Sequence, residues 1–305
     1  MNILFLGGSD NADISNRVCK GLRVNGAYAR TLTAKRHPFG YVQDLVGEDG
    51  IATLLAEGVE FDWIIGVGDS NYGTFDRLRA RLGPLVANAR LAIRHGGTAF
   101  RTRVALCNKN DRKFERRFVG SDLYRFVKDD PKAAPYFAPA DTIAARVEPH
   151  WTGPLRVGHS PSKRHTKGTE MILDALRGLD GIELELIERV SFKECAERRA
   201  RCHLFVDQIN PSIGGFGAST VEALSAGCAV LVDIRHIDPA VWAFYPRPPV
   251  LEVRSAPELR ARVQFLVRDR HTVEDFRAQS HAWASTVASP AAVGAYWLKH
   301  LEGTR

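Results

Sequence analysis

The most informative stretch of the sequence reads Asn210-Pro-Ser-Ile-Gly-Gly-Phe-Gly-Ala-Ser-Thr-Val-Glu-Ala-Leu-Ser-Ala-Gly-Cys-Ala-Val230. It follows an apolar run that ends at Asp207, so it predicts a strand, a glycine-rich turn and then a helix from about Gly217 to Ala226. The start of such a helix offers unpaired N–H groups and a partial positive charge, which together favour a phosphate group. Gly227 is expected to end the helix in a left-handed conformation.

Four residues of this stretch are candidate ligand contacts. The turn Gly215-Phe216-Gly217 allows the backbone to approach a ligand closely. Glu222 lies inside the helix, where its carboxylate could accept hydrogen bonds from a vicinal diol such as a ribose. A glycine-rich turn on its own more often makes only a tight connection, with an ordinary surface glutamate behind it, so the functional interpretation depends on the rest of the chain.

A second helix start, with cationic side chains before it, lies upstream. An apolar run from Leu155 to His159 leads into a loop that contains Ser160, Lys163, Arg164 and Lys167. Cations beside a helix N-terminus can hold a diphosphate leaving group. A basic loop alone is more often only solvated, but two phosphate-binding helix starts within one α/β domain favour a functional site.

Short apolar runs alternate with longer amphipathic segments from the first residue onward, which is typical of strand-helix units around a parallel sheet. In the first half we expect strands at 2–6, 27–32, 63–67, 91–93 and 117–119, and a helix at 14–24. In the second half we expect strands at 155–159, 182–187, 204–207, 229–233 and 250–253, and helices at 169–177, 192–201, 217–226 and through 257–301.

The alternation breaks between Val127 and Pro154, where prolines are frequent and periodicity is weak, so this segment is expected to connect two domains. We therefore predict an α/β protein with an N-terminal Rossmann-like domain over 1–150 and a C-terminal Rossmann-like domain over 151–305 that includes the C-terminal helices. Parallel sheets bind ligands at the carboxyl ends of their strands, so two such domains facing each other would place the site in a cleft.

The bulk composition bounds the possible partners. No apolar run is long enough to span a membrane, and the first residues lack the basic region of a signal peptide, so a cytoplasmic location is expected. The five cysteines are scattered and include no Cys-x-x-Cys, which argues against a disulfide framework and against a zinc site. The net charge of +7 suits an anionic partner, but it is too small to choose among nucleic acid, acidic lipid and a nucleotide diphosphate.

The pieces of the second half, taken together, resemble the C-terminal domain of GT-B glycosyltransferases of the group 1, or family 4, type. Their order and spacing match over about Leu155 to Asp233. The resemblance implies that Glu222 binds the donor ribose and that Lys167 contacts the donor phosphates. The matching pieces are His159-Ser-Pro-Ser, Lys167-Gly168-Thr169, Asp207-Gln208, Gly215-Phe216-Gly217 and Glu222-Ala-Leu-Ser-Ala-Gly227.

The first half resembles the same family more loosely. Gly7-Gly8 after the first strand matches the glycine loop that approaches the donor from the acceptor domain. The segment Arg94-His95-Gly96-Gly97-Thr98 resembles the family's His-Gly loop near the sugar and the acceptor, which implies a catalytic role for His95. Without the resemblance, a lone histidine at a strand end is more often structural.

Two positions depart from the family pattern. Gly214 replaces the first glutamate of the motif, which in the family helps to hold the donor sugar. Pro161 stands where many members carry an arginine, so Lys163 or Arg164 would have to take over phosphate binding.

The resemblance implies a hexosyltransferase-like enzyme that moves a sugar from a nucleotide-diphosphate sugar to an acceptor hydroxyl with retention of configuration. The chain has no Asp-x-Asp sequence, so we expect no metal and no cofactor, with Lys167 and Arg164 in the metal's place as catalytic cations. The acceptor would be a glycan, a lipid-linked molecule or a small molecule. The charge also permits a nucleic acid, although no basic-aromatic stripe supports one, and peripheral contact with a membrane stays open.

Two other classes of function remain open. A catalytically degenerate GT-B protein could act only as a binding partner, and Gly214 favours this alternative. A different nucleotide-binding α/β enzyme, such as an oxidoreductase or epimerase, is the other, although Gly7-Gly8-Ser9-Asp10 lacks the full Gly-x-Gly-x-x-Gly fingerprint.

Overall fold

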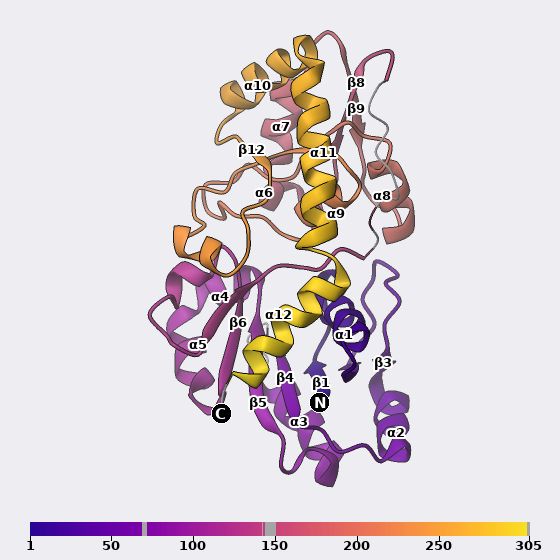
Figure 1. The fold of residues 1–305 in the computed structure, drawn as a ribbon, viewed down its shortest axis with the longest axis vertical. Coiled ribbons are helices and arrows are strands. Elements are labelled where there is room, and N and C mark those ends of the chain that lie inside the picture. Colours follow the sequence, from indigo (N-terminus) through magenta and orange to yellow (C-terminus); the bar gives the residue numbers. More distant parts are fainter. Residues whose placement is uncertain (69–71, 142, 144–150, 304–305) are drawn as a thin grey trace. The chain divides into compact units, whose positions relative to one another are not determined.

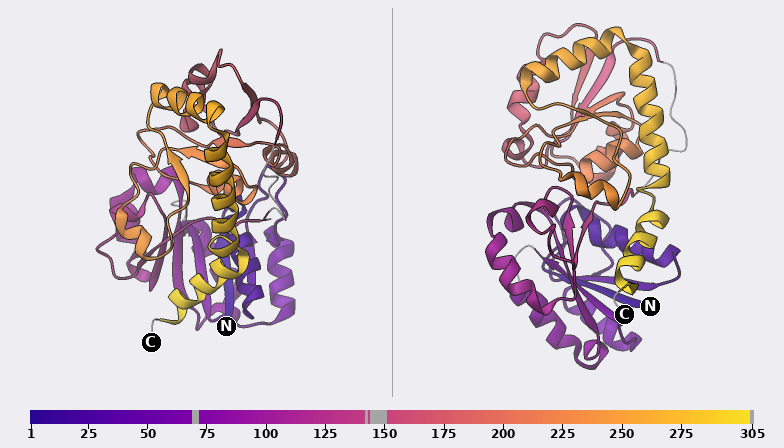
Figure 2. Two further views of the ribbon diagram at one scale, coloured as in Figure 1. Left: turned by 45° about the horizontal axis from the view of Figure 1, so that its top comes forward. Right: turned by 60° about the vertical axis from the view of Figure 1, so that its left-hand side comes forward.

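The structure is a computed structural model that describes residues 1–68, 72–141, 143 and 151–303 of the 305-residue chain. The chain forms two compact units, shown in Figures 1 and 2. Unit 1 consists of Met1–Pro139 and Pro290–Arg305, and unit 2 consists of Ala140–Ser289. Unit 2 is therefore inserted between two segments of unit 1.

Unit 1 alternates strands and helices along the chain. Its strands are β1 (Asn2–Gly7), β2 (Tyr28–Thr33), β3 (Leu45–Val46), β4 (Trp63–Gly68), β5 (Arg90–His95), β6 (Arg116–Gly120) and β7 (Ala133–Tyr136). Its α-helices are α1 (Ile14–Val24), α2 (Gly47–Glu57), α3 (Tyr72–Leu82), α4 (Gly97–Thr102), α5 (Val104–Asn110) and α12 (Pro290–Glu302). Short 3-10 turns occur at Asn11–Asp13, Gly83–Val86, Asp111–Lys113 and Tyr124–Phe126.

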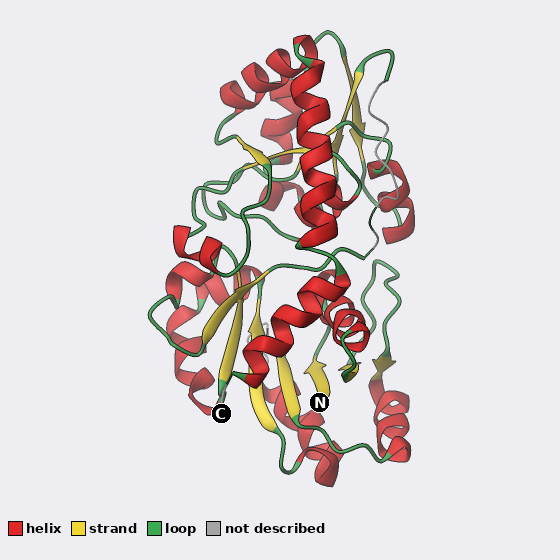
Figure 3. Ribbon diagram, viewed as in Figure 1, coloured by secondary structure: helices red, strands yellow, loops and turns green. Residues whose placement is uncertain are grey.

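The seven strands of unit 1 form one sheet in the order β3-β2-β1-β4-β5-β6-β7, and every pair is parallel. The interior strand β1 is apolar from Ile3 to Leu6, and these four residues have no exposed surface. A strand reads as a continuous apolar run when helices cover both faces of its sheet, as Figure 3 shows for unit 1. One of the two faces carries a core that includes Leu4, Ile64 and Phe75.

The proline-rich segment is partly a strand of unit 1. Pro135 lies in β7 and pairs in register with Val119 of β6. Because β7 is the last strand of the sheet, a residue without an N–H is tolerated there. The predicted connecting segment therefore begins too early, since its first part completes the sheet.

The last helix packs on unit 1. The ring of Trp297 in α12 has no exposed surface and stacks on Phe118 of β6, with ring centroids 3.8 Å apart. The backbones of α1 and α12 approach closely at two glycines, because a Cβ on Gly294 would lie 2.1 Å from the carbonyl oxygen of Gly21. Asn25 also donates a hydrogen bond of 2.8 Å to the carbonyl oxygen of Ala291.

Unit 2 repeats the alternating pattern. Its strands are β8 (Leu155–His159), β9 (Ile182–Leu186), β10 (Leu204–Val206), β11 (Ala229–Val232) and β12 (Val250–Glu252). Its helices are α6 (Arg164–Lys167), α7 (Thr169–Leu176), α8 (Phe192–Arg199), α9 (Ala218–Ser225), α10 (Ala256–Arg268) and α11 (Arg270–Thr286), with a 3-10 turn at Pro239–Ala243. The strands form a parallel sheet in the order β12-β11-β10-β8-β9.

The predicted fold class is confirmed, because both units are doubly covered parallel sheets of the Rossmann-like kind. The division of the chain differs from the predicted one in two ways. The units meet at Pro139 and Ala140, whereas the predicted boundary, at 150, lies outside the described residues. Helix α12, predicted as part of the second domain, belongs to unit 1, because the apolar ring of Trp297 completes the core of that unit. Among the described residues, no helix is long and apolar enough to cross a membrane.

Candidate functional site

The carboxyl ends of the central strands of unit 2 carry buried polar side chains. His159 ends β8, Asp207 follows β10 and Asp233 follows β11, and each of them is 1% exposed or less. The three strands are neighbours in the sheet order, so these side chains lie along one edge. Ligands of parallel α/β sheets bind at such an edge.

His159 has a structural role at this edge. One ring nitrogen, Nδ1, lies 2.7 Å from the carbonyl oxygen of Val206, and the other, Nε2, lies 2.9 Å from the hydroxyl of Thr169. Burial lowers the pKa of the imidazole, which favours the neutral ring. A carbonyl can only accept, so Nδ1 donates to it and Nε2 accepts from Thr169 at the start of α7. The ring thus ties β8, β10 and α7 together.

Lys167 and the first turn of α9 share one carboxylate. The Lys167 ammonium pairs with Oδ1 of Asp207, and the Thr220 hydroxyl donates a hydrogen bond of 2.6 Å to Oδ2. Burial alone would raise the pKa of Asp207, but Lys167 and Thr220 hold that pKa below its usual value, so the carboxylate is ionised. Asp207 therefore fixes a cation beside the start of α9, and Lys167 keeps further N–H donors for another acceptor.

The loops that precede α7 and α9 are joined to each other. Asn210 donates a hydrogen bond of 2.8 Å to the carbonyl oxygen of Thr166, and the N–H of Ile209 donates one of 3.2 Å to that of Lys167. The two predicted phosphate-binding segments are thus neighbours in unit 2. One ends at Lys167 and the other leads into α9.

The start of α9 is open at Gly217. A Cβ built on Gly217 would meet no atom within 4 Å, so a group could approach the backbone there. The first N–H groups of an α-helix have no partner inside the helix, which leaves donors directed into this space. Phe216 is 5% exposed and packs inward, so it shapes the turn and presents little surface to a ligand.

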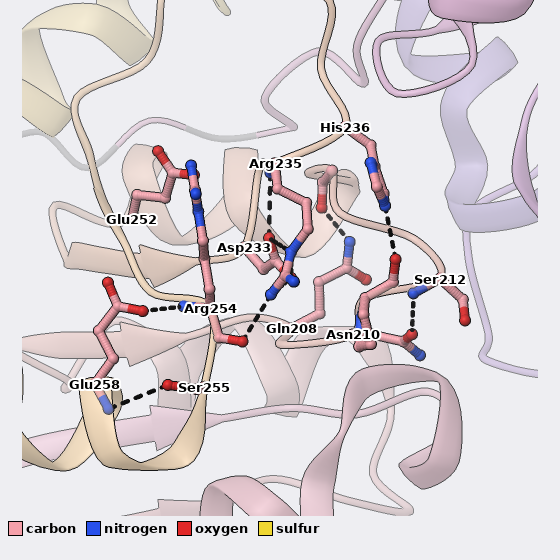
Figure 4. Close-up of polar contacts among 12 residues, drawn as sticks. Gln208, Asn210, Ser212, Asp233, Arg235, His236, Glu252, Arg254, Ser255 and Glu258 are labelled. Atoms are coloured by element: carbon pink, nitrogen blue, oxygen red, sulfur yellow. Dashed lines mark hydrogen bonds and ion pairs between the residues drawn. The ribbon is translucent and has the colours of Figure 1, made fainter.

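Polar side chains hold the loop between β10 and α9 (Figure 4). Gln208 donates a hydrogen bond to the carbonyl oxygen of Gly215, and His236 donates one of 2.7 Å to the carbonyl oxygen of Pro211. Asn210 accepts a hydrogen bond of 2.9 Å from the N–H of Ser212. The loop is therefore ordered in unit 2 by contacts that need no ligand.

The structure explains the glycine at position 214. Gly214 has a φ of +50°, and a Cβ there would lie 2.5 Å from the His236 ring and 2.8 Å from Cγ of Arg235. Figure 4 shows that Arg235 folds back onto the buried carboxylate of Asp233, with which it makes hydrogen bonds of 2.9 Å. The space in which a glutamate side chain would begin is thus filled by two basic residues.

Glu222 is held by an arginine that the sequence analysis did not single out. Arg199, the last residue of α8, places Nη1 2.8 Å from Oε2 of Glu222, and the two side chains are 4% and 11% exposed. Its other terminal nitrogen, Nη2, donates a hydrogen bond of 3.2 Å to the hydroxyl of Ser160. Burial acts against the charged guanidinium, but Glu222 raises the pKa of Arg199 above its usual value, so the pair is ionic. Two predicted donor-binding residues, Ser160 and Glu222, are therefore linked through one guanidinium.

A pocket of about 130 Å³ lies beside this ion pair. The ion pair contributes two of its charged lining residues, Arg199 and Glu222, and Phe192 contributes an aromatic residue. The Nε of Arg199 is buried and has no hydrogen-bond partner among the described residues. The remaining lining residues are Asp141, Ile143, Ala196, Ala200, Ser225 and Ala226.

The two other predicted cations of the upstream loop are exposed. Arg164 forms ion pairs with Glu170 and Glu188, at 2.8 Å and 2.6 Å. Its charge is therefore already balanced by two carboxylates, which makes it a poorer phosphate ligand than Lys167. Lys163 is exposed and forms no ion pair with another described residue.

In unit 1, the two predicted loop glycines differ in their surroundings. A Cβ on Gly7 would lie 2.6 Å from Cβ of Val67 on the neighbouring strand, so packing within the sheet already requires a glycine there. A Cβ on Gly8 would have only the methyl group of Thr74 nearby, at 4.0 Å. Only Gly8 therefore leaves open space at this end of the sheet.

His95 lies inside unit 1 with no exposed surface. Its Nε2 is 2.8 Å from Asp111, which also pairs with Arg117 at 3.0 Å and accepts a hydrogen bond of 2.8 Å from the Tyr72 hydroxyl. The imidazole is part of a buried polar network, and in this arrangement it cannot touch a ligand. Its predicted catalytic role stays a prediction, and one that would require the side chain to move.

A second polar network follows β1 at the same edge of the sheet. Arg94 of β5 donates hydrogen bonds of 2.9 Å to Asp10 and to the Tyr136 hydroxyl. Close by, Asp13 is 5% exposed, has a left-handed backbone with φ of 55°, and keeps its Oδ1 without a hydrogen-bond partner. Burial, with the nearby charge of Asp10, raises the pKa of Asp13 to about 7.

Residue types that could bind a metal, and the thiols, are dispersed in the described part of the chain. No group of three or more His, Cys, Asp or Glu residues there is arranged to hold a metal ion. All five cysteines are free thiols.

No family model matches the sequence, and no curated protein matches it either. The fold, however, is shared with solved structures. The chain superposes on Anabaena HepE in complex with UDP-glucose with a TM-score of 0.69 at 14% identity, covering 99% of this chain and 100% of that one. It superposes on an alpha-glucosyltransferase in complex with UDP-glucose and DNA containing an abasic site with a TM-score of 0.66 at 10% identity, covering 100% and 99%.

A third similar structure is that of a Listeria monocytogenes protein assigned as a UDP-N-acetylglucosamine 2-epimerase. Its TM-score is 0.57 at 12% identity, with 100% of this chain and 97% of that one covered. At these identities the comparisons establish the GT-B fold, and one fold can host different reactions.

Proposed function

We propose that this chain is a glycosyltransferase that moves a sugar from a nucleotide-diphosphate sugar to an acceptor hydroxyl. The observation that carries the proposal is the shared carboxylate of Asp207, which fixes the Lys167 ammonium next to the open first turn of α9. An ammonium and a helix N-terminus together bind a phosphate group. The similar structures that contain UDP-glucose point to the same class of ligand.

In the proposed reaction, the diphosphate is the leaving group. Negative charge develops on its bridging oxygen as the bond to the sugar breaks, and Lys167 and the N–H groups at the start of α9 stabilise that charge. The ammonium is held in place before the reaction by Asp207, so little reorganisation is needed. Independence from a metal belongs to the proposal, because the positive charge would come from the chain itself. Retention of configuration belongs to it as what the resemblance to family 4 glycosyltransferases implies.

The nucleoside part of the donor would lie near Glu222. A carboxylate can accept hydrogen bonds from both hydroxyls of a ribose, and the ion pair with Arg199 orients the side chain of Glu222. The pocket beside this pair, with the ring of Phe192, offers room next to the carboxylate. Ser160 would contribute through its hydrogen bond to Arg199.

The remaining predicted contacts have smaller parts in the proposal. Gly215 and Gly217 would let the diphosphate approach the backbone of unit 2, and the donor contact expected of Gly8 in unit 1 stays a prediction. Lys163 would add positive charge at the rim. Arg164, bound to two glutamates, would act only if a ligand displaced one of them.

Nucleotide binding tests the proposal directly. UDP, GDP, ADP and UDP-glucose are titrated into the full chain, with affinity measured by calorimetry and stabilisation by the melting temperature, which rises with any ligand that binds only the native state. We expect Glu222→Gln and Lys167→Met each to weaken the best ligand by about 10- to 100-fold, because a hydrogen bond to a charged group contributes about 1.5–3 kcal/mol.

Matched controls lie on α8, where Glu197→Gln and Lys193→Met change exposed residues of the same types. Both controls should bind the nucleotide as the wild type does. Absence of binding by any of the four ligands, or unchanged affinity in both site variants, would contradict the proposal.

An epimerase is the second candidate, because one protein with the same fold is assigned that activity. The two candidates are separated by incubating the enzyme with UDP-sugars and following the products by NMR. Transfer or hydrolysis releases UDP, whereas epimerisation changes the sugar and leaves the nucleotide attached. Binding without either reaction would identify a protein that has kept the donor site and lost the chemistry.

A further inference from the structure

Unit 1 carries an exposed loop, from Ala34 to Gln43, whose side chains have no part in the proposed donor site. It follows β2 and returns to β3 through Asp44. Its sequence is Ala34-Lys-Arg-His-Pro-Phe-Gly-Tyr-Val-Gln43, which combines cationic, aromatic and aliphatic side chains. We propose that this loop docks unit 1 on an anionic membrane surface.

The loop concentrates exposed apolar surface. Val42 is 83% exposed and Phe39 is 43% exposed. Among the large apolar residues that the structure describes as exposed, these two are the only ones within four residues of each other, and Val42 is the most exposed of all. Single exposed apolar side chains are ordinary, whereas apolar side chains exposed close together can mark an interaction site.

Three rings in the loop pack against one another. The centroid of His37 lies 5.0 Å from that of Phe39 and 5.0 Å from that of Tyr41, and Phe39 and Tyr41 are 6.3 Å apart. The rings therefore form one apolar body, with Val42 next to it in the chain. Aromatic and aliphatic side chains presented together suit the boundary between lipid headgroups and acyl chains.

The charge around this apolar body is positive. Lys35 and Arg36 are exposed, and the loop contains no acidic residue. Asp44, the next residue, is neutralised by Arg30 at 2.9 Å and by Arg23 at 3.1 Å. The exposed Lys20 of α1 lies one turn from Asn16, whose side chain donates a hydrogen bond of 2.6 Å to the carbonyl oxygen of Val42.

The loop is held in one shape before any partner arrives. The Gln43 side chain accepts a hydrogen bond of 2.7 Å from the N–H of His37 and donates one of 3.1 Å to the hydroxyl of Thr33. Because these contacts already restrict the backbone, docking would cost less conformational entropy than ordering a flexible segment.

A membrane fits these features better than a nucleic acid. Bases stack on exposed aromatic faces, and of the three rings in this loop only that of Phe39 belongs to an exposed residue. The most exposed apolar residue is the aliphatic Val42, which offers nothing to a base.

The expected binding is weak and reversible. Each Lys or Arg near an anionic surface contributes about 1 kcal/mol, and this contribution falls with rising salt. Reversing the charge of Lys35 and Arg36 should therefore reduce partitioning by about tenfold or more, since about 1.4 kcal/mol corresponds to a factor of ten.

Sedimentation of the full chain with vesicles tests the proposal. One set of vesicles is made of phosphatidylcholine alone, and the other contains an equal part of phosphatidylglycerol. We expect the wild type to sediment with the anionic vesicles at low salt and to be released at high salt. The double variants Lys35→Glu with Arg36→Glu, and Phe39→Ser with Val42→Ser, should each lose most of this binding.

The control is a double variant of unit 2, Arg262→Glu with Phe265→Ser, which changes an exposed arginine and a phenylalanine that is 47% exposed. An unchanged melting temperature establishes that each variant is folded. The proposal is overturned if the wild type does not sediment with anionic vesicles, or if the control variant loses as much vesicle binding as the loop variants. It is also overturned if the loop variants keep their binding to vesicles but lose binding to a single-stranded oligonucleotide.

Discussion

At the scale of single residues, Asp13 combines burial, an unusual backbone and an unpaired oxygen. Ala12 and Asp13 are consecutive non-glycine residues with φ of 57° and 55°. A left-handed conformation costs most residues energy, and Asn and Asp tolerate it best. The Asp13 carboxyl receives a hydrogen bond of 3.3 Å from Asn16, but its other oxygen is buried without a partner.

The raised pKa of Asp13 predicts a dependence of stability on pH. Its value is about 7 in the folded chain against 3.8 for a free carboxyl, so the folded state holds one more proton between these two values. The free energy of unfolding should therefore fall as pH rises through this range. The stabilisation that comes from the bound proton of Asp13 should be fully present below about pH 3.8 and fully lost above about pH 7.

Asp13→Asn removes this titration and keeps a side chain suited to the left-handed backbone. We expect the variant to be more stable than the wild type at pH 8, by up to about 4 kcal/mol, and nearly equal at pH 4. Chemical denaturation at the two pH values measures the difference, with the exposed Asp129→Asn as the control. A difference that does not depend on pH would show that Asp13 is ionised in the folded state.

The donor-site residues show what a sequence can and cannot reveal at this scale. Glu222 and Lys167 were identified from their positions in a pattern, and the structure gives both of them polar neighbours at one edge of unit 2. Their partners Arg199 and Asp207 contact them across 23 and 40 positions of the chain, and local periodicity contains no information on such pairs. An arginine at the end of an amphipathic helix is expected to be exposed, and Arg199 is 3% exposed.

At the scale of elements, the predicted strands and helices agree well wherever the hydrophobic pattern is strong. Helix α1 and strand β8 have the predicted bounds, Ile14–Val24 and Leu155–His159. The strands that were missed are β3, which has two residues, and β7, which contains Pro135. A two-residue strand has no readable period, and a proline argues against a strand unless its place at a sheet edge is known.

The contact between α1 and α12 predicts the effect of a single methyl group. Gly294→Ala should gain about 1 kcal/mol of helix propensity, but its Cβ would lie 2.1 Å from the carbonyl oxygen of Gly21. Overpacking of this kind costs about 1–3 kcal/mol or more, so we expect a net loss of stability. Thermal and urea unfolding measure it, and the exposed Ala295→Ser on the same helix is the control. Equal or greater stability of Gly294→Ala would mean that the helices do not approach as closely as described.

At the scale of the whole molecule, the two units have separate cores. The apolar clusters around Ile64 and around Leu204 share no residue, and each lies within one unit. The two ends of unit 2 are close together, because the N–H of Ala140 donates a hydrogen bond of 2.8 Å to the carbonyl oxygen of Ala288. A unit with its own core and adjacent ends can fold as a separate chain.

We therefore expect residues 140–289, produced alone, to unfold cooperatively and to bind the nucleotide that the full chain binds, within about tenfold in affinity, or about 1.4 kcal/mol. Circular dichroism during heating and calorimetric titration measure the two properties. The same fragment with Glu222→Gln is the control for specific binding. A fragment that folds but does not bind would place essential nucleotide contacts in unit 1.

The sequence pattern predicts two domains, but it places the last helix, α12, in the second domain, whereas α12 belongs to unit 1. Apolar periodicity predicts that a helix has a buried face, but it does not say which sheet that face covers. The answer depends on the stacking of Trp297 on Phe118 and on the close backbone approach at Gly21, and both partners are far from α12 in the sequence.

The return of α12 to unit 1 has a consequence for how the protein is made. A ribosome delivers the chain from its first residue, and domains generally fold as they emerge. Unit 1 is synthesised first, but its core is complete only after Trp297 has been added. Unit 2 is complete once Ser289 has been synthesised. Premature termination, or cleavage by a protease near residue 290, would thus destabilise unit 1 rather than unit 2. The ring of Phe118 would lose the cover of Trp297 and become accessible to chaperones or to aggregation.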